Sequence, residues 1–214
     1  INICKICIQS KSKRLVFLSS GAVYENSKKF KPEEQLIFNL FDYHQHFGLM
    51  KAASEQYLWS MLSKTNTQLS IYRVFTVVGP YMRIDGYFIL GNLINNILKN
   101  KKTFFKTDCK IYRNIIYVDD LVKQIMDYNK KEKFIIKNIV GKTVFLRDFL
   151  LKLFLNYKID TKFSTKKNTY RINYKPYEKG HKFHNKYLFD SFDKTLDWFR
   201  SRENKKFKIY KFKE

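Results

Sequence analysis

Apolar and polar positions in the first half of the chain alternate between short apolar runs and helical spacing. Leu15–Leu18 is an apolar run that stops at Ser19-Ser20-Gly21, which is typical of a buried parallel strand ending in a loop. Apolar and small residues then recur at helical spacing from Gly48 to Leu62, and Leu69–Val78 is again β-branched and apolar. This order predicts a βαβ unit with the helix as crossover, preceded by the end of another crossover helix at Ile1–Ile8.

The second half continues the alternation with shorter elements. Helices are expected over 86–99, 118–128, 143–155 and 191–199, and strands over 102–105, 111–117 and 134–140, with a turn at Thr107-Asp108 between the first two strands. After Asn156 the pattern is polar and weakly periodic until the last helix. The pattern therefore predicts an α/β fold with a smaller, less regular C-terminal portion.

Charge adds a possible partner to this picture. The chain has 42 basic and 19 acidic residues, a net charge of +23, and such a balance attracts nucleic acid without sequence preference. Only eight of the basic residues are Arg, however, and apart from the tail Lys205–Lys213 the Lys residues are scattered, as in a composition biased toward A and T codons. We therefore expect no nucleic-acid site, but a weak attraction to anionic sugars, phosphates or membrane surfaces.

Neither a membrane span nor a metal site is expected. The longest apolar stretch, Phe145–Phe154, contains three charged residues and falls short of the ~18–20 residues that a span needs. The three cysteines, Cys4, Cys7 and Cys109, are odd in number, and no further Cys or His pair completes a zinc set. The spacing Cys4-x-x-Cys7 is interpreted as two thiols on a helix in a reducing cytoplasm, where we expect the protein to reside.

Two ordered motifs carry the candidate chemistry. Ser19-Ser20-Gly21-Ala22-Val23-Tyr24 ends the first strand, and Phe47-Gly48-Leu49-Met50-Lys51-Ala52-Ala53-Ser54-Glu55 opens the following helix. Positions 47 and 51 are four residues apart and project from one face of that helix. The pair resembles the Tyr-x-x-x-Lys motif of the extended short-chain dehydrogenases/reductases, the NAD-dependent nucleotide-sugar epimerases and dehydratases, except that Phe47 stands where the family has its catalytic Tyr.

The resemblance implies catalytic roles for three positions. Ser20 would hold the sugar hydroxyl that is oxidised, and Lys51 would bind the cofactor ribose and lower the pKa of a phenol at position 47. Phe47 carries no hydroxyl, so the proton transfer of the relatives cannot take its ordinary route here. Tyr43, one helical turn earlier, and the neighbouring His44 and His46 are alternative proton carriers.

Further motifs extend the resemblance over nearly the whole chain. In Arg73-Val74-Phe75-Thr76-Val77-Val78-Gly79-Pro80, it implies that Val74 and Phe75 pass the nicotinamide and that Thr76 contacts the substrate in place of the usual Asn. Asn92 would contact the nucleotide part of the substrate, and Arg113 would bind its diphosphate, for which a planar guanidinium is suited. Asp120 is expected to cap the helix that follows, and Leu196-Asp197-Trp198 to serve packing.

The resemblance also defines the expected organisation and partners. It implies a partial Rossmann-like, doubly wound parallel sheet over residues 1–80, the C-terminal half of a dinucleotide-binding domain, and a smaller substrate-binding region interleaved with the last sheet elements over 81–214. A nucleotide-diphosphate sugar would be the substrate, NAD or NADP the cofactor of the complete protein, and a homodimer the assembly. No Gly-x-x-Gly-x-x-Gly turn occurs among the seven glycines. We therefore expect a chain that begins several elements into the fold, and either an oxidoreductase or a non-catalytic sugar-nucleotide binder or gene remnant.

Overall fold

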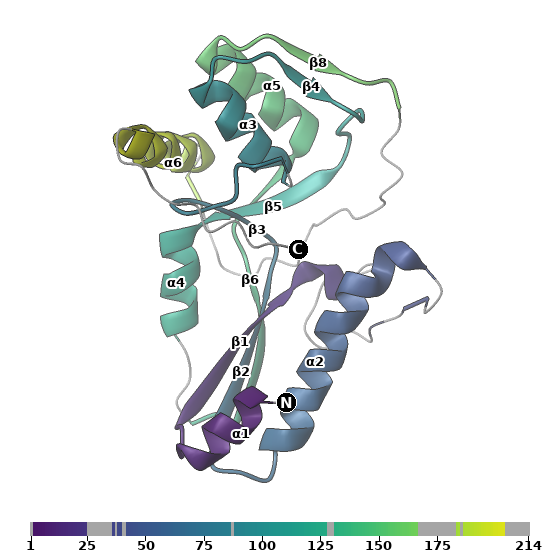
Figure 1. The fold of residues 1–214 in the computed structure, drawn as a ribbon, viewed down its shortest axis with the longest axis vertical. Helices are drawn as coiled ribbons and strands as arrows, with labels where there is room; N and C mark the ends of the chain where they lie inside the picture. Colours follow the sequence, from purple (N-terminus) through teal and green to yellow (C-terminus); the bar gives the residue numbers. More distant parts are fainter. Residues whose placement is uncertain are drawn as a thin grey trace.

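The structure is a computed structural model that describes residues 2–24, 36, 38–39, 42–86, 88–127, 131–166, 183–184 and 186–203. Tyr87, Tyr128 and the basic tail Lys205–Lys213, which the sequence patterns included, lie outside these residues. Figure 1 shows an elongated molecule with one sheet at its lower end, the two N-terminal helices beside that sheet, and most of the remaining strands and helices above it.

The lower sheet contains the predicted βαβ unit. Its strands β1 (Arg14–Ser20), β2 (Gln68–Val74) and β6 (Phe134–Ile139) are all parallel, in the order β1-β2-β6. Helix α2 (His46–Leu62) is the crossover from β1 to β2, and its buried Leu58 and Leu62 form a core with Cys4 of α1 (Asn2–Gln9) and with β2. The prediction of a Rossmann-like α/β fold with a parallel sheet is confirmed (Figure 1).

The expected single strand Leu69–Val78 is wrong in one respect, because the chain changes sheet at Phe75. Strand β3 (Thr76–Val78) pairs in parallel with β5 (Tyr112–Tyr117), and β5 pairs in antiparallel with β7 (Lys142–Phe145). Helix α4 (Val118–Met126) packs beside both sheets, since its Leu121 shares a core with residues of β2, β5 and β6. Because β2 ends at Val74 and β3 begins at Thr76, the ends of β1 and β2 lie next to the start of the second sheet.

The helix expected from Thr143 begins three residues later. Residues 142–145 form β7, and helix α5 runs from Leu146 to Tyr157. The side chain of Asn114, fully buried on β5, explains the difference: its amide donates to the Gly141 carbonyl (2.9 Å) and to the Thr143 hydroxyl (3.0 Å), and its carbonyl accepts from Gly141 N–H (2.8 Å). These bonds hold 141–143 against β5, where Val144 also favours a strand.

The upper part of the molecule contains the largest core. Helices α3 (Ile89–Leu98), α5 and α6 (Tyr187–Glu203) surround it, with fully buried Leu93, Ile94 and Leu150 at its centre. Strand β4 (Thr103–Phe105) forms where a short strand was expected, and it pairs in parallel with β8 (Thr161–Phe163). Sequence analysis did not predict β8, because the pattern after Asn156 is polar. Leu196 is fully buried in this core, which agrees with the packing role expected for its motif.

Among the helices that the structure describes, none is long and apolar enough to cross a membrane. The thiols of Cys4 and Cys7 are both buried on α1, and Cys109 is buried in the upper core. Within the same residues, no group of three or more His, Cys, Asp or Glu side chains could hold a metal ion.

Asp120 stabilises the start of α4 through a tyrosine instead of capping it directly. Asp120 is the third residue of α4, where an acid commonly accepts from the backbone N–H of the N-cap residue. Here the hydroxyl of Tyr187 lies between them: it accepts from the N-cap Tyr117 N–H (3.0 Å) and donates to the Asp120 carboxylate (2.9 Å). The first residue of α6 is thereby joined to the first turn of α4.

We expect Tyr187→Phe to lower the free energy of unfolding by about 1–3 kcal/mol, because it leaves the N–H of buried Tyr117 without its acceptor and removes a hydrogen bond to the partly buried Asp120 carboxylate. Burial, together with donation to Asp120, raises the pKa of Tyr187 above its ordinary value of 10.0. A raised native pKa stabilises the fold fully below pH 10 and loses that effect as the pH rises further. Chemical denaturation from neutral to alkaline pH should therefore show a steeper loss of stability for the wild type than for Tyr187→Phe; equal slopes would contradict this assignment.

Candidate functional site at the end of the first strand

The turn after β1 and the start of α2 are in direct backbone contact. After β1, residues Gly21–Tyr24 form the short helix η1, all four of them buried. A Cβ added at Gly48 would lie 2.3 Å from the carbonyl oxygen of Ala22, so only glycine allows α2 to approach η1 this closely. This contact places Phe47 and Lys51, on the first turns of α2, beside the end of β1.

Gly48→Ala is expected to destabilise the protein by about 1–3 kcal/mol, since a backbone atom must move to admit the methyl group. In an ordinary helix interior the same change would stabilise by up to about 1 kcal/mol, so the sign of the effect tests the contact. Ser60→Ala, at an exposed position of α2, is the matched control and should be neutral or slightly stabilising. Thermal and denaturant unfolding of both variants measures the difference.

The ends of β1 and β2 bring three predicted residues together. Ser20, the last residue of β1, is the register partner of Val74, the last residue of β2, and its hydroxyl accepts from Ala22 N–H (3.2 Å). Phe75 follows, and its ring covers Gly21 so closely that a Cβ there would lie 2.2 Å from a ring carbon. Ser20, Val74 and Phe75 therefore line one end of the parallel sheet.

Lys51 reaches the same region from α2. Its ammonium donates to the Leu18 carbonyl of β1 (3.0 Å) and lies 5.1 Å from the centre of the Phe17 ring and 5.9 Å from that of Phe47. Phe47 itself is half exposed, with 53% of its surface accessible. Positions 47 and 51 thus share one face of α2, as the spacing predicted, and both lie beside the end of β1.

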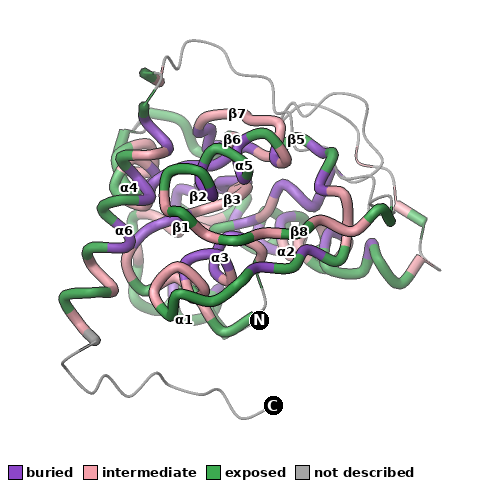
Figure 2. Tube along the Cα trace, turned by 90° about the horizontal axis from the view of Figure 1, so that it is seen from above, coloured by how far each residue is buried: buried purple, intermediate pink, exposed green. Residues whose placement is uncertain are grey.

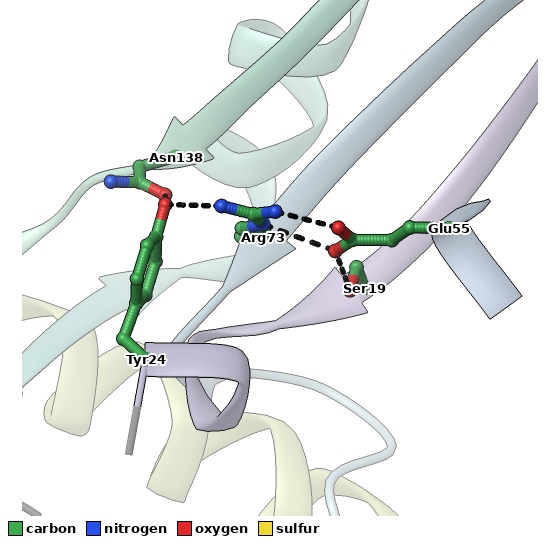
Figure 3. Close-up of polar contacts among 5 residues, drawn as sticks. All are labelled: Ser19, Tyr24, Glu55, Arg73 and Asn138. Atoms are coloured by element: carbon green, nitrogen blue, oxygen red, sulfur yellow. Dashed lines mark hydrogen bonds and ion pairs between the residues drawn. The ribbon is translucent and has the colours of Figure 1, made fainter. Parts of the chain in front are cut away.

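A buried polar network connects α2 to η1 and to the strands of the parallel sheet (Figure 3). The Arg73 guanidinium on β2 donates to both Glu55 carboxylate oxygens on α2 (3.0 and 2.6 Å) and to the Tyr24 hydroxyl on η1 (2.8 Å). Ser19 of β1 donates to Glu55 (2.5 Å), and Tyr24 donates to Asn138 of β6 (2.9 Å). Three strands, η1 and the site helix are joined through one guanidinium.

The charges in this network stabilise one another. Arg73 and Glu55 side chains are only 4% and 7% exposed. Burial alone would lower the pKa of Arg73, but the Glu55 carboxylate and the Tyr24 hydroxyl outweigh it and raise that pKa. Burial raises the pKa of Tyr24, which therefore remains a neutral hydrogen-bonding phenol at neutral pH and is not poised as a base.

Sequence reasoning missed the roles of Glu55, Tyr24 and Asn138. A signal for them was present, because Arg73 interrupts an otherwise apolar strand and a buried guanidinium needs a carboxylate partner. Glu55 lies four residues after Lys51, on the helix that crosses between the two strands. The tertiary partners Tyr24 and Asn138 have no comparable signature.

The alternative proton carriers lie at the solvent-facing entry of α2. Tyr43 and His44 belong to the short helix η2 (Tyr43–Gln45), and Tyr43, His44 and His46 are all exposed. The rings of Tyr43 and His46 lie 4.8 Å apart, and a His46 ring nitrogen contacts the Tyr43 carbonyl. These contacts turn both side chains toward each other at the helix entry.

The remaining predicted residues lie on the second sheet and α3. Thr76 of β3 pairs with Ile115 of β5, and Arg113, two residues earlier on β5, donates to the Tyr112 carbonyl (2.9 Å). Asn92 on α3 donates to the Gly86 carbonyl (3.0 Å). Ser20 and Phe75 therefore lie at the ends of β1 and β2, with Phe47 and Lys51 of α2 beside β1. Asn92 and Arg113, in contrast, make local hydrogen bonds on separate elements.

The residues fit one end of a dinucleotide. Lys51, Val74 and Phe75 provide an ammonium and an aromatic surface at the carboxyl end of parallel strands, which is where α/β sheets bind such ligands. The glycine-rich turn that cradles a pyrophosphate is not in the sequence. The chain thus contains the expected nicotinamide-side residues without the pyrophosphate-side turn.

Comparisons with solved structures agree with this architecture. Relatives include UDP-N-acetylglucosamine 4-epimerase from Methanobrevibacter ruminantium in complex with UDP-N-acetylmuramic acid, with 22% identity and a TM-score of 0.76 over 94% of this chain and 67% of that one. UDP-glucuronic acid 4-epimerase from Bacillus cereus, in complex with UDP-glucuronic acid and NAD, has 20% identity and a TM-score of 0.68, with coverages of 93% and 65%. A double mutant of dTDP-glucose 4,6-dehydratase from Streptomyces venezuelae has 17% identity and a TM-score of 0.73, with coverages of 94% and 64%.

These TM-scores establish a shared fold, with this chain spanning about two thirds of each structure. No curated protein sequence matches significantly. The sequence profile of the NAD dependent epimerase/dehydratase family, however, matches residues 1–135, more than half of the chain, including both site motifs. The chain therefore belongs to the NAD-dependent epimerase/dehydratase family.

Proposed function

We propose that this protein acts on a nucleotide-diphosphate sugar as an NAD-dependent epimerase- or dehydratase-type oxidoreductase whose proton-transfer step is impaired by Phe47. The observation that carries the proposal is the placement of Lys51 and position 47, on the first turns of α2, beside strand β1, which ends at Ser20. In this arrangement the Ser20 hydroxyl orients the sugar hydroxyl that is oxidised, and Lys51 holds the ribose of the cofactor. NAD, or NADP, when bound, supplies the hydride acceptor that converts the hydroxyl to a keto group.

Binding of the substrate is assigned to the second sheet and α3. Arg113 would bind the diphosphate and Asn92 the nucleotide, with Thr76 facing the sugar. The division at residue 80, between a cofactor-binding part and a substrate-binding region, follows from these assignments. A cytoplasmic location and a homodimer that packs through α2 complete the proposal; the exposed side chain of Met50 on α2 supports such an interface.

A second function, nucleotide-sugar binding without turnover, is favoured by one observation. Phe47 has no atom that can exchange a proton, and Tyr43 and His46 are engaged with each other at the entry of α2. The two functions share the binding site and differ only in chemistry.

Calorimetric titration with UDP- and dTDP-sugars tests the nucleotide-sugar binding that both functions share. We expect saturable binding that Arg113→Ala weakens by about 10–100-fold, because a charge-assisted hydrogen bond to phosphate contributes about 1.5–3 kcal/mol. Arg200→Ala, on the exposed face of α6 beside Asp197, is the matched control and should leave affinity unchanged. Absence of binding to the wild type, or equal losses in both variants, would overturn the proposal.

A further inference from the structure

The β4–β8 ribbon at the top of the molecule has one face turned to the core and one to solvent (Figure 1). Its inner side chains, Phe105 and Phe163, stack on each other (ring centres 5.0 Å apart) and pack on Phe154 of α5. On the outer face, Phe104 pairs in register with Lys162 and has 62% of its surface exposed. Moving this exposed aromatic ring from water into an apolar phase would be favourable in free energy.

A second exposed apolar side chain and a set of lysines belong to the elements that form this end of the molecule. Helices α3 and α5 both end here and lead directly into β4 and β8, and Leu155 on the last turn of α5 is 81% exposed. The pink and green colouring of β8 in Figure 2, which views the molecule from above, shows how little of the strand is buried. We define the ribbon face as Phe104 and Leu155 with the exposed lysines around them: Lys101, Lys102, Lys106, Lys158, Lys162 and Lys166.

The charge of the ribbon face is one-sided. Among the described residues 99–106 and 155–166, Asp160 is the one acidic side chain, and it forms an ion pair with Lys102 (2.8 Å). A second acid, the half-buried Asp108, borders the face, and its N–H donates to the Lys166 carbonyl (2.9 Å). Six lysines against these two carboxylates leave a local excess of positive charge. Apolar side chains surrounded by lysines are the pattern of a surface that lies on an anionic bilayer, where the charges meet headgroups and the apolar groups enter the acyl boundary.

We propose that the ribbon face docks the protein on anionic phospholipid membranes. The proposal concerns attachment to the bilayer surface and is independent of the proposed enzymatic function. An anionic bilayer fits better than nucleic acid, because Leu155 is aliphatic and cannot stack on bases, whereas both Leu155 and Phe104 gain by leaving water at an acyl boundary.

Vesicle co-sedimentation tests the proposal directly. The full chain is mixed with phosphatidylcholine vesicles with and without phosphatidylglycerol, and we expect binding only when the anionic lipid is present. The triple variant Lys101→Glu, Lys106→Glu, Lys162→Glu should weaken binding at least about 100-fold, since each lysine near an anionic surface contributes about fivefold. Phe104→Ser should weaken it further by about tenfold, because the ring no longer enters the boundary.

Matched variants away from the ribbon face show whether binding depends on this face or on the overall positive charge of the protein. Lys5→Glu, Lys13→Glu, Lys64→Glu changes the net charge by the same amount at exposed positions on and around α1 and the end of α2, and Met126→Ser removes an equally exposed apolar side chain from α4. Both should leave vesicle binding nearly unchanged. Equal losses for the two triple variants, or no binding by the wild type, would overturn the proposal.

A fluorescent reporter shows whether position 104 enters the bilayer. Cys4, Cys7 and Cys109 are all buried, so an environment-sensitive dye can be attached selectively after Phe104→Cys. We expect its emission to shift to shorter wavelength on anionic vesicles. If the protein binds the vesicles but the emission does not shift, position 104 does not enter the bilayer and the proposal is overturned. Oligonucleotide binding is measured as well. If the ribbon-face triple variant loses oligonucleotide binding but still binds vesicles, the face belongs to another partner and the proposal is also overturned.

Discussion

Glu55→Gln is expected to lower the free energy of unfolding by about 3–5 kcal/mol, a large share of the stability of a typical domain. The substitution keeps the shape of the side chain but leaves the Arg73 guanidinium buried without its carboxylate. Ser19 loses its charged acceptor in the same step. Chemical denaturation monitored by circular dichroism measures the loss.

Two controls show whether the loss arises from the buried charge. Asp85→Asn breaks the ion pair between Asp85 and Arg83, two side chains that are each more than half exposed. It should lower the free energy of unfolding by only about 0–1 kcal/mol. The double substitution Glu55→Leu, Arg73→Met removes both charges and should recover much of the stability lost in Glu55→Gln. Similar costs for Glu55→Gln and Asp85→Asn would contradict the role assigned to the network.

Phe47→Tyr should raise the rate of sugar oxidation by about 10²–10⁴-fold, because it places a phenol beside Lys51 that can exchange the proton of the sugar hydroxyl. The ammonium of Lys51 lies 5.9 Å from the ring centre of residue 47, close enough to lower the pKa of such a phenol. The measurement compares Phe47 and Phe47→Tyr in a hybrid that joins this chain to the glycine-rich half of a related epimerase, with nicotinamide absorbance as the readout.

Phe104→Tyr in the same hybrid controls for the addition of a phenol elsewhere and should leave the rate unchanged. A gain confined to Phe47→Tyr supports an oxidoreductase with an impaired proton transfer. Equal rates with intact sugar-nucleotide binding would contradict that function and favour the non-catalytic binder.

Most of the parallel sheet could be predicted from sequence because its signals are local. The apolar run before Ser19, the helical spacing from Gly48 and the β-branched run from Leu69 each follow from periodicity within a few residues. The spacing of four residues between positions 47 and 51 likewise placed both on one face of α2. The structure agrees on each of these points.

The parts that sequence reasoning missed depend on residues far apart in the chain. Strand β7 forms where a helix was expected because Asn114, almost thirty residues earlier, holds Gly141 and Thr143. Strand β8 is polar on its outer face and is defined by its pairing with β4. Tyr187 acts on Asp120 from 67 residues away. None of these contacts leaves a periodic pattern within one segment.

In the proposed function position 47 faces the bound nucleotide sugar, and fluorine NMR can detect this contact. A trifluoromethyl-phenylalanine incorporated at Phe47 is titrated with UDP-glucose and UDP-N-acetylglucosamine, and one at Phe134, on the far strand β6, serves as control. We predict a saturable shift of the Phe47 signal, absent in Arg113→Ala, with no shift at Phe134. An unchanged Phe47 signal at sugar concentrations that saturate the protein, or equal shifts at both positions, would contradict the account.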